Sequence, residues 1–269
     1  MELFFQLIIF VLMLGMAIYA FRVDKFKISI KHLTYTAIFV VISVVLQSYS
    51  IRMVVAGFDA FHVGITQVPL MLLGAFLGLP WAFIGGFVQD LIGLMLNPTG
   101  FPFLGFTLNK ILYAFIPALW FRSQRFQGKQ LIRIGQFGIV LTYLSAMFVI
   151  LNNQQIDLNG FLIENSLKYG LLLLLAVVML VIIFMLNFLY KKKEAESGAP
   201  YSKWIISVIS VEIAVKYIGT PLWLLIMYKI PFITSMLLRF VTSSLMMFVY
   251  IVLGFVLYKV VSQSEITRL

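Results

Sequence analysis

The sequence contains no cysteine and few charged residues, and both shortages narrow what the protein can be. Without cysteine, the chain forms no disulfide bond and offers no thiolate ligand to a metal. Charged residues make up 11% of the chain and hydrophobic residues 62%, whereas about a quarter of the residues of a soluble domain are charged. The composition therefore excludes a water-soluble globular domain.

Sequence motifs of several enzyme and channel classes are also missing. No GxxxxGK(S/T) loop occurs, so the chain does not hydrolyse ATP in the P-loop manner by itself. There is no HExxH zinc motif, and the two histidines, His32 and His62, stand isolated in the sequence. A TVGYG-like filter and a regular arginine series are absent as well. We therefore expect a protein that is not an enzyme and that uses no metal or cofactor.

Apolar segments long enough to cross a bilayer recur along the whole chain, which is typical of an all-α integral membrane protein. The first of them is followed, and not preceded, by positive charge, so we expect an uncleaved helix instead of a secretory signal. No convincing internal repeat is visible. We expect nine spans, near residues 3–21, 33–50, 63–78, 81–96, 105–121, 134–151, 168–190, 204–227 and 237–259.

The net charge of +10 comes largely from basic clusters between these spans, which argues against nucleic acid as a partner. Clusters of this kind stay on the cytoplasmic side of a membrane. The sequence therefore predicts an external N-terminus, a cytoplasmic C-terminus and external loops at 51–62, 97–104, 152–167 and 228–236. The clusters are Arg22, Lys25, Lys27 and Lys31; Arg122, Arg125, Lys129 and Arg133; and Lys191, Lys192, Lys193 and Lys203.

Three features of the connections bear on the packing of the spans. The turn Gly78-Leu79-Pro80 is so short that the spans on either side of it must form a tight hairpin. Residues 191–203 are charged and contain Gly and Pro, which indicates a flexible linker. Small residues four apart allow helix backbones to approach closely in lipid; they are Gly74 and Gly78, Ala82 and Gly86, and Ala114 and Ala118.

An acid stands inside the fourth span, on a face of small and polar residues. Gly86, Asp90, Gly93 and Asn97 are spaced so that they share one side of a helix. An ionisable group within a bilayer costs several kcal/mol and is a candidate functional site. Asp90 is either a hydrogen-bond acceptor for the N–H groups of a ligand or a structural acid paired with a Lys or Arg of a neighbouring helix.

The eighth span carries a second acid. Glu212 precedes Lys216 by four residues, the favourable order for an ion pair within a helix, and such a pair is the simpler interpretation. Pro221, one turn later, lacks an N–H group and is expected to kink this helix toward whatever it lines.

Cations and aromatic residues gather at the expected outer side. Each cation alone is typical of an interfacial residue whose charge reaches toward water. Together with aromatic rings they suit an organic anion with a flat ring, because rings stack and cations hold carboxylates. The cations are Arg52, Lys110, Lys168, Lys229 and Arg239, and the aromatic residues are Phe101, Phe103, Phe106, Tyr113 and Trp223.

Several of these segments resemble a known family. The runs VGITQVPLMLLGAFLG (63–78), GGFVQDLIGLMLNPTG (85–100), LGFTLNKILYAFIPAL (104–119) and PLWLLIMYKIPFITSMLLR (221–239) are similar to the S components of energy-coupling factor (ECF) vitamin transporters, with the folate group nearest. The order and spacing of the GxxxD helix, the PTG loop and the GFTL helix start carry the resemblance.

The resemblance implies a fold of six helices, of which about 33–121 and 204–260 are matched. Residues 1–32 would be an extra N-terminal helix with a basic cytoplasmic loop, and 33–121 would be helices 1–4 of the family. Residues 122–203 would hold an inserted helix pair with basic linkers, and 204–269 would be helices 5–6 with a cytoplasmic tail.

The resemblance also implies a function. Such a subunit, in a bacterial plasma membrane, captures a vitamin at the outer face, and a coupling subunit with two cytoplasmic ATPases drives its delivery. A face of Thr34, Ala37 and Val41 would dock on the coupling subunit, although the family's Ala-xxx-Ala pattern is degenerate here. The implied substrate-binding residues are Asp90, Pro98, Thr99, Gly100, Phe106, Thr107, Asn109, Lys110, Trp223, Tyr228 and Arg239.

The resemblance does not decide which vitamin the subunit binds. The folate group tends to have Asn where this chain has Thr220, so folate or a related pterin competes with other vitamins or precursors. If the cargo is a pterin, Asp90 would accept the paired N–H donors of its aminopyrimidine edge. Two functions of other classes are an ion-coupled secondary carrier that uses Asp90 or Glu212, and a membrane enzyme that acts on lipid.

Overall fold

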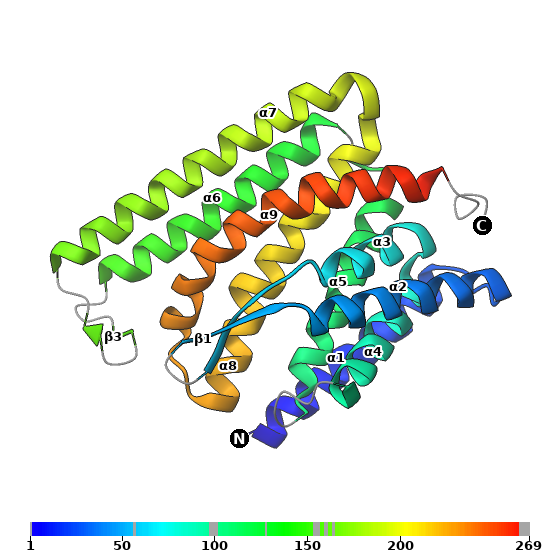
Figure 1. Ribbon diagram of the computed structural model, residues 1–269, viewed down its shortest axis with the longest axis horizontal. Coiled ribbons are helices and arrows are strands. Elements are labelled where there is room, and N and C mark those ends of the chain that lie inside the picture. Colours follow the sequence, from blue (N-terminus) through cyan, green and yellow to red (C-terminus); the bar gives the residue numbers. More distant parts are fainter. Residues whose placement is uncertain are drawn as a thin grey trace. The chain divides into compact units, whose positions relative to one another are not determined.

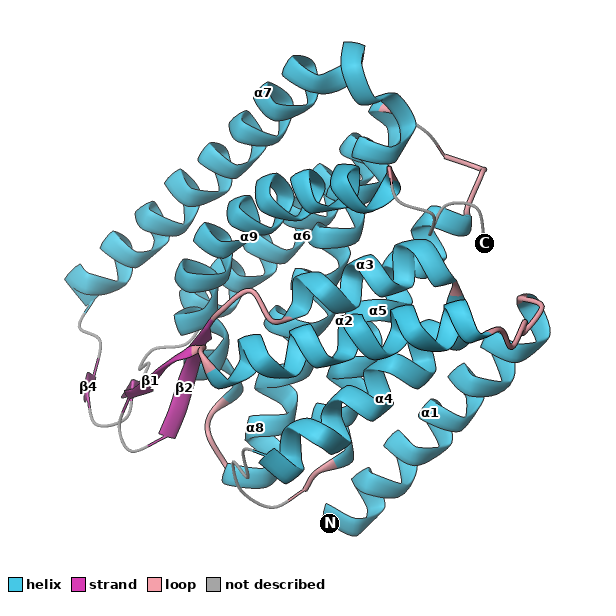
Figure 2. Cartoon of the chain, turned by 45° about the vertical axis from the view of Figure 1, so that its right-hand side comes forward, coloured by secondary structure: helices cyan, strands magenta, loops and turns pink. Residues whose placement is uncertain are grey.

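The computed structural model describes residues 2–55, 58–96, 102–126, 128–152, 157–158, 161–162 and 165–263. Almost all of them are helical (Figure 1). Two short hairpins interrupt the helices: β1 (Ile51–Val55) pairs with β2 (Phe58–Val63), and β3 (Asp157–Leu158) runs antiparallel to β4 (Phe161–Leu162) (Figure 2). The helices are α1 (Glu2–Val23), α2 (Ile30–Ser48), α3 (Gln67–Leu77), α4 (Leu79–Leu96), α5 (Leu104–Arg122), α6 (Lys129–Asn152), α7 (Asn165–Val211), the π-helix η1 (Glu212–Gly219), α8 (Thr220–Tyr228) and α9 (Phe232–Ser262).

Eight stretches of helix in the described part of the chain are long and apolar enough to cross a membrane. They coincide with eight of the nine expected spans, so a multi-pass helical membrane protein is confirmed at that level. The share of buried residues differs between these stretches, from 17% in the windows within Leu3–Val23 and Leu167–Lys191 to 61% in those within Leu104–Arg122 and Pro200–Tyr228. The apolar side chains that the least buried of these helices expose suit contact with lipid.

The one expected span that does not coincide with a membrane-length helix, 63–78, is shorter than predicted. Residues up to Val63 are extended in β2, and α3 contains 11 residues. At 1.5 Å per residue, such a helix is about 16 Å long, roughly half the thickness of a hydrocarbon core. It ends at Gly78, whose φ of 81° suits glycine. That single residue separates α3 from α4, so the expected tight hairpin is present.

The prediction of a flexible linker at 191–203 is wrong. These residues belong to α7, which continues from Asn165 to Val211 as hydrogen-bonded helix and includes Pro200. In Figure 1, α7 turns sharply between its two parts, so this one helix contributes to two membrane-length stretches. The two membrane-length stretches are Leu167–Lys191 and Pro200–Tyr228, the latter reaching through η1 and α8. Charge and Pro alone therefore did not break the helix.

The chain divides into two compact units. The first contains residues 1–52, 62–124 and 249–269, and the second contains 53–61 and 125–248. Helices α1 to α5 and the second half of α9 therefore belong to the first unit, and α6 to α8 with the first half of α9 belong to the second. Each unit is described by itself below.

In the first unit, glycines allow α3, α4 and α5 to pack closely. Helix α5 contacts both α3 and α4, and α2 contacts the same two helices from another side. A methyl group placed on Gly74 would overlap the carbonyl group of Ala114, with 2.7 Å to its carbon, and one placed on Gly86 would lie 2.5 Å from the Cα of Ile111. The close approach expected from the small residues is confirmed at these two positions.

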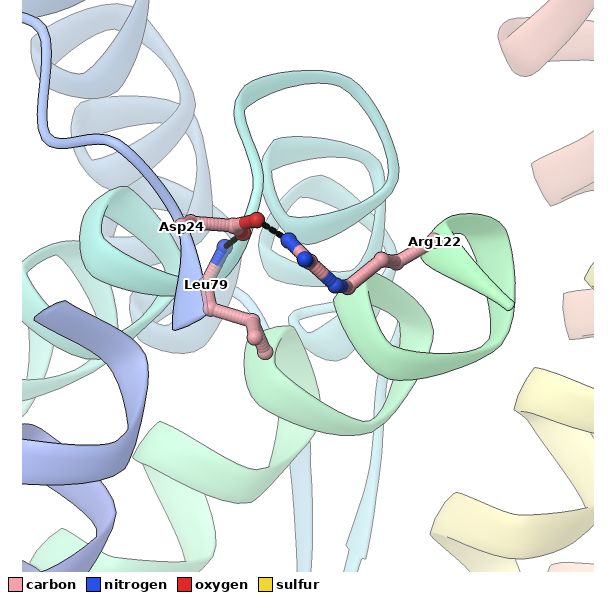
Figure 3. Close-up of polar contacts among 3 residues, drawn as sticks. All are labelled: Asp24, Leu79 and Arg122. Atoms are coloured by element: carbon pink, nitrogen blue, oxygen red, sulfur yellow. Dashed lines mark hydrogen bonds and ion pairs between the residues drawn. The ribbon is translucent and has the colours of Figure 1, made fainter. Parts of the chain in front are cut away.

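An ion pair ties together three connections at one end of the first unit (Figure 3). Asp24, which follows α1, pairs with Arg122 in the last turn of α5. Its other carboxylate oxygen accepts a hydrogen bond of 3.0 Å from the N–H of Leu79, the first residue of α4. A carboxylate at a helix N-terminus satisfies an otherwise unpaired N–H and interacts favourably with the helix dipole. We call Asp24, Leu79 and Arg122 the clamp.

Replacing Asp24 by alanine is expected to lower the free energy of unfolding by about 1.5–3 kcal/mol, the range for hydrogen bonds to charged groups. Thermal unfolding of the full chain in detergent would measure the loss. A double-mutant cycle with Arg122→Ala isolates the ion pair, since Asp24→Ala also removes the contact with Leu79. If the double variant lost the sum of the two single losses, the pair would contribute nothing and the assignment would be wrong.

In the second unit, α6 packs against α7, and both contact η1, which is continuous with α8 (Figure 1). The disturbance expected before Pro221 takes the form of the π-helix. There the N–H and the hydroxyl of Thr220 both bond to the carbonyl of Val215, the hydroxyl at 2.8 Å. A wider turn is a reasonable response to Pro221, because proline cannot donate the regular hydrogen bond.

Candidate functional site

Polar side chains from three apolar helices meet at one end of the first unit. They come from the last turn of α2, the second half of α4 and the first two turns of α5, so the antiparallel helices bring these ends together. The clamp lies at the opposite ends of α4 and α5. We call this set the polar cluster; it consists of Gln47, Gln89, Asp90, Thr107 and Lys110.

Asp90 is the acid at the centre of the polar cluster. Its side chain is 6% exposed, and its Oδ2 accepts a hydrogen bond of 2.7 Å from the hydroxyl of Thr107. The ammonium group of Lys110 also attracts the Asp90 carboxylate electrostatically. An ionised carboxylate has about four acceptor sites, so the bond from Thr107 leaves capacity for a ligand. Both expected roles of Asp90, ligand acceptor and structural acid with a cationic neighbour, agree with this geometry.

Two glutamines join the cluster, and the sequence prediction missed both. The Oε1 atom of Gln47 accepts hydrogen bonds from Nε2 of Gln89, at 2.8 Å, and from Nζ of Lys110, at 3.0 Å. Gln89 is fully buried, and its own Oε1 has no hydrogen-bond partner among the described residues. A buried amide oxygen of this kind is costly unless a donor reaches it. Amides within apolar spans were the available signal in the sequence.

Glycine on α4 makes room for the polar cluster. A methyl group on Gly93 would lie 3.2 Å from Oε1 of Gln47, and Gly86 lets the backbone of α5 come close at Lys110. The predicted face of Gly86, Asp90 and Gly93 is therefore a surface for helix packing that carries one acid. The fourth member of that face, Asn97, lies outside the described residues.

The other predicted site residues of the first unit fall into three groups. Asn109 is buried on α5, and Phe106 is half-buried on the same helix with its ring 6.1 Å from that of Phe103. The expected lid residues Pro98, Thr99 and Gly100 lie outside the described residues. On α2, the expected docking residues Thr34, Ala37 and Val41 are all exposed.

The remaining predicted residues belong to the second unit. Trp223 is buried on α8, Tyr228 is exposed at the end of the same helix, and Arg239 is buried on α9. The sequence prediction placed them in one site with Asp90, and that stays a prediction.

The second unit contains a buried hydroxyl cluster that the sequence did not reveal. Tyr143 of α6 and Tyr217 of η1 both hydrogen-bond the hydroxyl of Ser244, and Ser244 donates to the carbonyl of Phe240. The ring of Tyr217 stacks on that of Phe240 with 4.4 Å between the centroids. Glu212, 1% exposed, acts electrostatically on both tyrosines. A buried cluster of hydroxyl groups next to an acid, within membrane-length helices, is a second candidate functional site.

The described residues contain no group of three His, Cys, Asp or Glu side chains that could hold a metal ion. Comparison with protein-family models, with curated proteins and with solved structures finds no match for this chain.

Proposed function

We propose that this chain is the substrate-binding subunit of an ECF-type importer, which captures a vitamin, folate or a related pterin, at the outer face of the membrane. A coupling subunit and two cytoplasmic ATPases would supply the energy. The observation that carries the proposal is the buried Asp90 with Thr107, Lys110 and two glutamines around it, at the helix ends beside the loop 97–103. An acid and a cation together suit a ligand that carries both N–H donors and a carboxylate.

The position of this cluster relative to the basic residues supports capture from outside. Arg22, Lys25 and Arg122 lie at the clamp end of the first unit, which the distribution of charge assigns to the cytoplasm. The polar cluster belongs to the opposite helix ends. A solute arriving from outside would therefore meet Asp90 and Lys110 before the clamp.

The proposal is tested by the mass of a bound solute. Native mass spectrometry of the detergent-purified full chain is expected to detect a co-purified small molecule, and added folic acid is expected to bind without ATP. In proteoliposomes, uptake should require the coupling subunit and the ATPases. Uptake by the chain alone, collapsing with the proton gradient, would overturn the proposal.

That contrary result would favour an ion-coupled secondary carrier of a small organic anion. Glu212 is the observation in its favour, since it is buried in a π-helical segment of a membrane-length helix together with Tyr143 and Tyr217. Intramembrane acids next to hydroxyl groups are typical of proton pathways, and π-helical segments are frequent at functional sites. In a carrier, Glu212→Gln would abolish proton-driven uptake, whereas in the importer it would leave ATP-driven uptake in place.

A further inference from the structure

The connection between α1 and α2 has the composition of a membrane-surface segment. Residues 22–31 alternate basic and apolar side chains, and we call them the basic segment. Lys25 and Lys27 are exposed, and so are the apolar side chains between and after them, with Ile28 80% and Ile30 85% exposed. Because α1 and α2 both have the length and apolarity of membrane spans, the segment that joins them lies at a membrane surface.

The basic segment is held in place at both of its ends. The clamp fixes Asp24 at the first end. At the other end the hydroxyl of Ser29 accepts a hydrogen bond of 3.2 Å from the N–H of His32 and so caps α2. Between them the ring of Phe26 packs on that of Trp81, with 5.2 Å between centroids. The lysines are therefore displayed from a fixed backbone.

The positive charge of the basic segment is not neutralised from within. Asp24 is its one acid, and that carboxylate is already engaged by Arg122 and by the N-terminus of α4. Among the described residues no acid pairs with Arg22, Lys25 or Lys27, so these three cations can attract an anion from outside the chain.

A buried donor lies beside the same segment. Trp81 is 5% exposed, its ring contacts Phe26 and stacks on His32, and its indole N–H has no hydrogen-bond partner among the described residues. Because this nitrogen is covered by the protein, Trp81 supports the basic segment from beneath through its contacts with Phe26 and His32. The exposed lysines are the part of the segment that an anion from outside can reach.

We propose that the basic segment binds the headgroup of an anionic phospholipid of the cytoplasmic leaflet. Lys25 and Lys27 hold the anionic headgroup, and Phe26, Ile28 and Ile30 enter the boundary between headgroups and acyl chains. A lipid fits better than a free anion, because the exposed apolar residues alternate with the lysines and would otherwise face water. The site is independent of the polar cluster and of the solute that the protein transports.

The test compares two variants of the full chain that lose the same charge. Lys25→Gln with Lys27→Gln removes two cations of the basic segment, and Lys168→Gln with Lys229→Gln removes two cations of the second unit. Native mass spectrometry would record binding of dioctanoyl phosphatidylglycerol and of dioctanoyl phosphatidylcholine to each purified protein.

The unmodified chain is expected to prefer phosphatidylglycerol. The Lys25 and Lys27 variant should bind it about 30-fold more weakly, which corresponds to about 1 kcal/mol for each lysine, and the control variant should behave like the unmodified chain. The preference should also fall as salt is added, since salt screens exposed charges.

Equal binding of the two lipids by the unmodified chain would overturn the proposal, and so would an equal loss in both variants. Inorganic phosphate serves as a third probe. If phosphate displaced phosphatidylglycerol at matched concentrations, the ligand would be a free anion and the lipid assignment would be wrong. The salt dependence of the unmodified chain needs no variant, so the proposal stays testable even if a variant fails to fold.

Discussion

Replacing Gly74 by alanine is expected to destabilise the first unit by about 1–3 kcal/mol, the cost of overpacking a close contact. The added methyl group would overlap the carbonyl group of Ala114, and that carbonyl is backbone in the middle of α5. Because a helix backbone cannot move aside as a side chain does, α3 and α5 would have to separate. Thermal unfolding of the full chain in one detergent would show the effect as a lower Tm.

Gly15→Ala is the matched control. Gly15 lies in α1, and a methyl group there would meet nothing within 4 Å. Both changes replace a glycine in an apolar helix, so they share any gain from helix propensity and differ in packing. If the two variants had the same Tm, the close approach of α3 to α5 would not contribute to stability, and the described packing would be refuted.

Hydropathy was sufficient to predict the membrane-length helices, and its failures have physical reasons. Eight expected spans coincide with helices because a bilayer requires a long run of apolar residues whose hydrogen bonds are made internally. The expected span 63–78 was too long at its start, because Val63 ends β2 and residues 64–66 form a turn before α3 begins at Gln67, and hydropathy alone does not mark such a boundary. The segment 191–203 is helical although α7 turns sharply between its two membrane-length stretches, so its charge, Gly and Pro predicted a break in the span and not a break in the helical hydrogen bonding.

The candidate site was predicted in part. Asp90 was found because a charge within an apolar span is conspicuous, and the small residues four apart correctly predicted close packing at Gly74 and Gly86. The clamp was not found, because Asp24 and Arg122 are nearly 100 residues apart and only the packing of α1 against α4 and α5 brings them together. Sequence spacing within one helix is readable, whereas partners on different helices depend on the fold.

Asp90→Asn is expected to weaken binding of folic acid by the purified chain roughly 10- to 150-fold, which corresponds to the 1.5–3 kcal/mol of a hydrogen bond to a charged group. Asparagine keeps an oxygen that can accept the bond from Thr107, so the contact between α4 and α5 should persist. What the change removes is the negative charge and one of the two oxygens that paired N–H donors of a pterin would use. Isothermal titration of the detergent-purified variants would measure the affinity.

Asp24→Asn provides the control for Asp90→Asn, because it removes the charge of another acid of the first unit at the opposite helix ends. Asp24→Asn should lower the Tm and leave the affinity for folic acid unchanged. Asp90→Asn should lower the affinity for folic acid and leave the Tm unchanged. Full folate affinity in Asp90→Asn would refute the role of Asp90 as a ligand acceptor. If Asp90→Asn instead lowered the Tm as much as Asp24→Asn while binding folic acid normally, Asp90 would be a structural acid that serves the electrostatic attraction to Lys110.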